Sequence, residues 1–129
     1  MSSKKEIAAS NALSASAALL VQAEAGQGFA APHNNQPANF LVVVTDNISG
    51  LAITNLTQKN FAIVDHFSIP GQTCGFSGNI TSFNNVLNGA YQIQVKPKNC
   101  NWVAGDYLAQ IIVSTKTSNG QATAKLSVK

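Results

Sequence analysis

Residues 90–96 read AYQIQVK, residues 106–113 read DYLAQIIV, and residues 121–128 read QATAKLSV. In each stretch an apolar side chain recurs at about every second position, which is the period of a β-strand with one buried face. Turn-forming Gly and Asn residues separate the stretches. The C-terminal part of the chain is therefore predicted to consist of short antiparallel strands.

The same alternation continues toward the N-terminus, and with the turns it predicts seven strands. The pair Asn119-Gly120 suits the positive φ angles of a type I′ hairpin turn. Seven short strands with turn signals at regular spacing are typical of a β-sandwich. The predicted strands cover residues 39–45, 51–56, 60–67, 79–86, 90–96, 106–115 and 121–128.

Several motifs resemble those of bacterial immunoglobulin-like modules. Val42 and Val44 precede Asp46 in a V-x-V-x-D pattern, residues 55–61 read NLTQKNF, and residues 89–95 read GAYQIQV. The resemblance covers residues 39–128 and implies a seven-stranded Greek-key sandwich, with no activity attached. Antibody domains carry their cysteines in facing strands, whereas the two cysteines here lie in turn-like sequence. We expect Trp102 to pack on a bridge between them from outside the core.

Residues 1–31 differ in composition from the rest, with ten alanines between Ala8 and Ala31. Ser3 and Glu6 form a capping-box pattern, and Gly26 and Gly28 would end a helix. We expect a retained helical arm over 1–31, a linker over 32–38 and a sandwich over 39–129. The arm would dock onto a neighbour through a weak apolar stripe formed by Ile7, Leu13, Ala17 and Leu20.

A signal peptide is the competing interpretation of this segment. Lys4 and Lys5 provide a basic start, and Ala23-Glu24-Ala25 resembles a cleavage site. Glu6 and several serines dilute the apolar stretch between them. In either case the segment is too polar to span a bilayer as a helix.

Cys74 and Cys100 are the only cysteines, and a disulfide between them is the simplest interpretation, with free thiols as the alternative. A disulfide would place the protein in an extracytoplasmic or secreted location, whereas free thiols would fit the cytoplasm. Two thiols cannot form a zinc site alone, and neither His33 nor His66 stands at a ligand spacing from them. No metal or cofactor is expected.

The composition is 45% hydrophobic and only 10% charged, with fourteen Asn and with eight Lys but no Arg. A surface of neutral hydrogen-bonding groups fits secreted β proteins and subunits that pack against copies of themselves. The net charge of +3 comes from scattered lysines, and without Arg there is no bidentate reader of bases. Nucleic-acid binding is not expected.

The loops at 67–79 and 97–105 are the most promising binding region, because they combine aromatic and apolar residues with Gly, Pro and Asn. Either these side chains face a partner, or the loops fold back as a small core around the disulfide. Tyr91 and Tyr107 each follow a turn glycine and suit a tyrosine corner. The candidate partner-binding residues are Phe67, Ile69, Phe76, Trp102 and Val103.

The chain offers little for catalysis. Asp65 and His66 are adjacent, so on a strand they would face opposite sides. His66 with Ser68 is the best fragment of a hydrolase site, and no nucleophile-elbow motif accompanies it. We therefore expect a non-catalytic interaction or structural protein that recognises a protein partner or itself. A secreted carbohydrate-binding or adhesin module, with Trp102 stacking on sugar, is the alternative.

Overall fold

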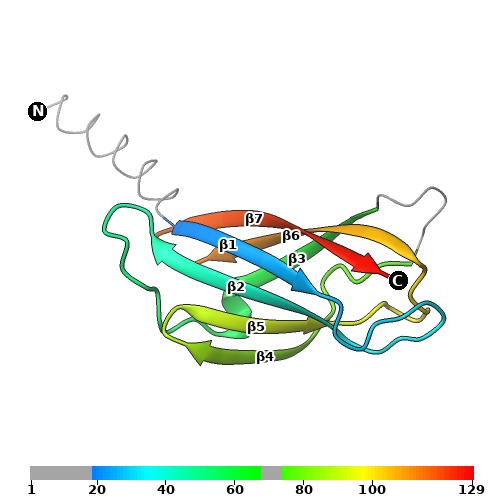
Figure 1. Ribbon diagram of the computed structural model, residues 1–129. Coiled ribbons are helices and arrows are strands. Elements are labelled where there is room, and N and C mark those ends of the chain that lie inside the picture. The colour runs from blue at the N-terminus through cyan, green and yellow to red at the C-terminus, as the bar shows by residue number, and fades with distance from the viewer. Residues whose placement is uncertain (1–18, 68–73) are drawn as a thin grey trace, which may run out of the picture.

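The structure, a computed structural model, describes residues 19–67 and 74–129. These residues form a two-layered all-β sandwich (Figure 1), with a single turn of 3-10 helix, η1, at Gln58–Asn60. The strands are β1 (Leu19–Gly26), β2 (Ala38–Asp46), β3 (Phe61–Phe67), β4 (Ile80–Leu87), β5 (Ala90–Val95), β6 (Gly105–Ser114) and β7 (Asn119–Val128).

The strands divide into two antiparallel sheets. One sheet has the order β1-β2-β5-β4 and the other the order β3-β6-β7. The chain passes from the first sheet to the second after β2 and β5, and returns after β3. Strands distant in sequence, such as β2 and β5, therefore lie side by side, with Phe40 opposite Ile93 and Val42 opposite Tyr91.

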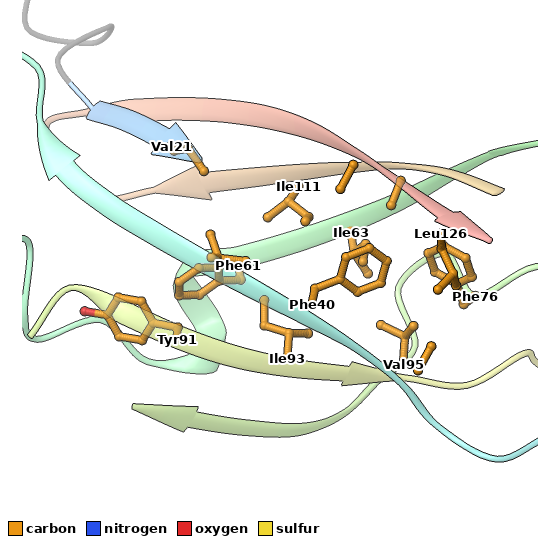
Figure 2. Packing of buried hydrophobic residues seen from close by; sticks show 14 of the residues in the cluster. Val21, Phe40, Phe61, Ile63, Phe76, Tyr91, Ile93, Val95, Ile111 and Leu126 are labelled. Atoms are coloured by element: carbon orange, nitrogen blue, oxygen red, sulfur yellow. The ribbon is translucent and has the colours of Figure 1, made fainter. Parts of the chain in front are cut away.

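The core lies between the inner faces of the two sheets, where alternate residues of each strand point (Figure 2). On β2, for example, Phe40, Val42 and Val44 are fully buried, while Leu41 between them is exposed. A period of two places every second side chain on the same face. Burial of this apolar surface, at about 25 cal/mol per Å2, is the main favourable term for folding.

Six of the seven predicted strands are present within a residue or two of their predicted bounds, and the seventh is not. Residues 51–56 form only an isolated bridge, between Ala52 and Thr45. The hydroxyl of Tyr91 donates to the carbonyl of Ile53 and accepts from the N–H of Leu56. This segment is thus held by a buried side chain instead of a strand ladder.

The helix predicted to reach residue 25 is wrong for the described part of the arm, because residues 19–26 form β1. All eight residues pair with β2, from Leu19 opposite Asp46 to Gly26 opposite Asn39. Leu19 and Val21 are buried, while Leu20, Gln22 and Glu24 are exposed, which is a strand alternation. The sandwich therefore begins before residue 39, and Ala38 already belongs to β2. Ile7, Leu13 and Ala17 lie outside the described residues.

Strand β1 also lies beside β7 and closes that side of the sandwich (Figure 1). Gly120 makes this approach possible: a Cβ built there would lie 2.5 Å from the carbonyl oxygen of Leu19 and 3.0 Å from Val21 Cγ2. The predicted turn at Asn119-Gly120 is wrong, because both residues belong to β7 and the chain reverses at residues 115–118. Gly120 is needed for close packing and not for a positive φ angle.

We expect Gly120→Ala to lower the free energy of unfolding by about 1–3 kcal/mol, because the added methyl group must displace β1. Gly26→Ala is the matched control, since a Cβ at that position meets nothing within 4 Å. Urea unfolding of both variants measures the difference. Equal stability of the two would show that β1 does not pack against β7 in this way.

Candidate functional site

The disulfide predicted between Cys74 and Cys100 is present, with their Cα atoms 6.1 Å apart. It joins the segment before β4 to the loop between β5 and β6. Nearby, Asn79 donates its side-chain N–H to the carbonyl of Lys96, and Lys98 N–H donates to Gly75. The bridge therefore fixes two loops at one end of the sandwich.

Trp102 is buried in the core at this end, with 1% of its surface exposed. Its ring lies 5.8 Å from that of Phe76 and 5.2 Å from that of Tyr107. Its indole N–H donates to the carbonyl of Gln36 at 2.6 Å, so the loop before β2 is bound to the loop before β6. The expectation that Trp102 packs from outside the core is wrong.

Two of the aromatic residues proposed to meet a partner, Phe76 and Trp102, are therefore not available for one. Phe76 is fully buried between Phe40 and Tyr107, and Trp102 cannot stack on a sugar. The loops fold back as a small core, which was the alternative interpretation. Of the remaining candidates, Val103 is exposed, Phe67 is the last residue of β3, and Ile69 lies outside the described residues.

Phe29 at this end was not singled out from the sequence, yet it is 75% exposed. It lies in the loop between β1 and β2, and its N–H donates to the carbonyl of Pro37. The arm predicted over residues 1–31 includes Phe29, which follows the two glycines expected to end the helix. Only the strand assignment of β1 places it on a surface loop.

The two candidate tyrosines have buried rings and hydrogen-bonded hydroxyls. The Tyr107 hydroxyl donates to the carbonyl of Val103 at 3.0 Å and accepts from its N–H at 2.9 Å, four residues upstream at the start of β6. The Tyr91 hydroxyl instead reaches the segment 53–56. Both tyrosines hold loops in place, and neither presents its ring to solvent.

Asp65 is the one buried charged residue among those described, and it faces the core from β3. Neither carboxylate oxygen has a hydrogen-bond partner within the described parts of the chain. Burial raises the pKa of Asp65 to about 6, and the backbone of Phe76 and the charge of His66 offset only part of this effect. Asp65 therefore holds a proton in the folded protein at mildly acidic pH.

His66 points to the other side of β3, where its Nε2 lies 2.9 Å from Oε1 of Gln110. Asp65 and His66 consequently face opposite sides and cannot act on one atom. Ser68, the other member of the hydrolase fragment, lies outside the described residues. Among residues 19–67 and 74–129, no three His, Cys, Asp or Glu side chains are grouped so that they could hold a metal ion.

The outer face of the β1-β2-β5-β4 sheet carries two adjoining hollows, of about 360 and 260 Å3. Leu41 and Glu24 line both of them, and Val86 and Gln92 complete the larger one. A third groove of about 500 Å3 lies between the edge strands β3 and β4, against Phe61, Ile63 and Ile80. The first two hollows make this outer face the leading candidate for a binding surface.

These features define an all-β sandwich with one disulfide and a hollowed sheet face on which Glu24 is the one charged residue that lines the hollows. No protein-family model matches the chain, and no curated protein or solved structure proves similar to it. Within the described residues, no helix is long and apolar enough to cross a membrane. The function is therefore argued from the surface itself.

We expect Trp102→Ala to reduce the free energy of unfolding by about 3–5 kcal/mol, because it empties the aromatic cluster and removes the bond to Gln36. Val103→Ala serves as control, since its exposed side chain should contribute under about 1 kcal/mol. Guanidinium unfolding of both variants gives the comparison. A Trp102→Ala protein of unchanged stability would contradict the core position of this ring.

We expect the free energy of unfolding to fall as pH rises from about 4 to about 6, because of Asp65. Its pKa is 3.8 in the unfolded chain and about 6 in the folded protein, so the folded state binds the proton more tightly. The protonated fold is favoured at low pH, and its advantage is lost as pH rises through this window, by roughly 2–3 kcal/mol in total. Asp65→Asn should remove this loss, as urea unfolding at several pH values would show.

Asp46→Asn is the control for this measurement. The pKa of Asp46 is lowered by hydrogen bonds from the N–H groups of Ser49 and Ile48, so its contribution is lost only as pH falls. The Asp46 variant should keep the fall in stability between pH 4 and 6. If Asp65→Asn also kept it, another group would be responsible.

Proposed function

We propose that this protein is a non-catalytic interaction or structural protein with an immunoglobulin-like sandwich, and that it acts by protein–protein recognition, with self-assembly as the favoured mode. The observation that carries the proposal is the uneven distribution of exposed apolar side chains over the described surface.

The strand order supports the immunoglobulin-like assignment. Constant-type immunoglobulin domains place their first, second, fifth and fourth strands in one sheet and their third, sixth and seventh in the other, as here. They also place a tyrosine corner near the start of the sixth strand, where Tyr107 lies. The disulfide differs, because it joins two loops instead of the facing strands β2 and β6.

Six of the nine large apolar side chains that are strongly exposed in the described chain belong to the β1-β2-β5-β4 sheet or to the loop that follows β2. Four belong to β1, β2 and β4, and two lie in the loop after β2. Monomeric proteins rarely concentrate exposed apolar groups in this way, and such patches mark interaction sites. The six are Leu20, Leu41, Ile48, Leu51, Val86 and Leu87; the others are Phe29, Val103 and Leu108.

In this proposal the N-terminal segment contributes to docking onto a neighbour. Leu20, one of its four predicted docking residues, is exposed on the outer face of β1. Residues 1–18 join the sandwich at Leu19, directly beside Leu20. Docking of Ile7 and Leu13 onto a neighbour therefore remains our hypothesis for this segment.

The loops at the disulfide end have a smaller part in partner recognition in this proposal than the sequence analysis predicted. The rings of Phe76 and Trp102 stabilise the core, and Val103 and Phe29 are the strongly exposed apolar groups among the described residues at this end. The adhesin alternative relied on Trp102 for sugar stacking, and burial of that ring removes its main support. We retain protein recognition as the proposed function.

An extracytoplasmic location is part of the proposal. The Cys74–Cys100 bond supports it, because structural disulfides persist in oxidising compartments. The low content of charged residues is consistent with this location.

Light scattering of the full chain over roughly a hundredfold range of concentration, spanning micromolar values, tests self-assembly. We expect the mass to rise above that of the monomer, since burial of the exposed apolar side chains favours association. The double variant Ile7→Ser/Leu13→Ser, compared with Ser14→Ala as control, measures the part played by the N-terminal segment. A constant monomer mass at every concentration would contradict self-assembly.

A further inference from the structure

We infer that the outer face of the β1-β2-β5-β4 sheet is the self-association surface, and that its partner is the same face of a second copy. This inference rests on the proposed self-assembly and specifies which surface carries it. The face is defined by the outward-pointing residues of the four strands.

Leu41 lies at the centre of this face. It belongs to the inner strand β2, opposite Glu24 of β1 and Gln92 of β5, and it is 43% exposed. It lines both hollows of the face. A partially exposed leucine between two hollows is suited to insert into a hollow of a complementary surface and to be covered by it.

An irregularity in β4 adds apolar surface at the edge of the face. The register shifts between Asn85 and Leu87, so that Leu87 pairs with Ala90 and Val86 has no partner of its own. Val86 nevertheless lines the larger hollow with Leu41. Such a bulge sets two residues against one on the neighbouring strand, and here it adds an exposed Val86 to the exposed Leu87.

The polar groups of the face are nearly all neutral. Its amides both donate and accept hydrogen bonds, as the bond from Gln94 Nε2 to Asn39 Oδ1 shows. Glu24 is the one charged side chain among the outward residues of the four strands. Two copies of this face can therefore pair without bringing several like charges together. The amides are Gln22, Asn39, Asn84, Gln92 and Gln94.

The outer face of the opposite sheet carries more charged groups. The outer face of β3-β6-β7 carries His66, and it carries Lys125 with Asp106, whose charged groups lie 3.8 Å apart. Burial of such charges against a second copy would require desolvation of each. The charge distribution thus favours one sheet over the other as the contact.

The size of the face agrees with a weak dimer. Four strands spaced about 4.8 Å apart and eight residues long at about 3.3 Å each cover roughly 500 Å2 per copy. Two copies would bury about 1,000 Å2, near the lower limit for a specific interface. A two-fold axis lets the same patch serve on both copies, which is the commonest arrangement of homodimers.

The test uses sedimentation equilibrium of the full chain and two matched variants. Leu41→Lys places a charge at the centre of the proposed interface, and we expect it to weaken association about tenfold or more. Leu108→Lys is the control, because Leu108 is 39% exposed on the central strand β6 of the other sheet. It should associate like the wild type. Thermal melts establish that both variants are folded.

A mixture distinguishes pairing of like faces from pairing of unlike surfaces. Leu41→Lys and Leu41→Asp should each be monomeric alone and should associate when mixed, because opposite charges then meet near the two-fold axis. Failure of the mixture to associate would overturn the same-face arrangement in favour of another occupant, such as residues 1–18 of a neighbour.

The remaining outcomes separate this inference from the proposed function. Undiminished association of Leu41→Lys, or equal weakening by Leu108→Lys, would overturn the choice of face and leave self-assembly standing. A wild-type chain that stays monomeric throughout would overturn both.

Discussion

Contact between the inner faces of the two sheets is the interaction on which the other features depend. Phe40, Tyr91 and Ile93 from one sheet meet Ile63 and Ile111 from the other in a continuous buried cluster. Because strand residues alternate, every inward side chain fixes its neighbour on the outer face. The outer surface of each sheet is thus positioned by the core, and the two surfaces are free to differ in charge.

The two ends of the sandwich are stabilised in different ways. At one end, the disulfide, Trp102 and Tyr107 bind three loops to the core. At the other, Tyr91 holds the segment 53–56 by its hydroxyl. Asp65 is an exception to this apolar packing, since its carboxylate is buried without a hydrogen-bond partner among the described residues. Its burial makes the fold more stable in mild acid than at neutral pH, which is the opposite of the effect of most carboxylates.

Much of the fold could be predicted from local alternation, and the parts that could not depend on tertiary contacts. Six strands followed from period-two patterns, and the disulfide from the presence of only two cysteines. Strand β1 was missed because Ala, Leu, Gln and Glu favour helices, whereas eight pairs with β2 decide its conformation. Trp102 stands in a polar loop sequence, and only the approach of two distant loops buries it. Exposed Leu41 follows from alternation, but the bulge that adds Val86 does not.

The placement of the first and last strands has a mechanical consequence. Strand β1 begins at one end of the sandwich, and β7, which lies beside it, finishes at the other (Figure 1). Hydrogen bonds in antiparallel pairs run perpendicular to the strands. Tension applied through the two termini would therefore pull along β1 and β7 and load their ladders in shear, with many bonds resisting together instead of opening one by one. This geometry would let the sandwich resist force applied along its strands.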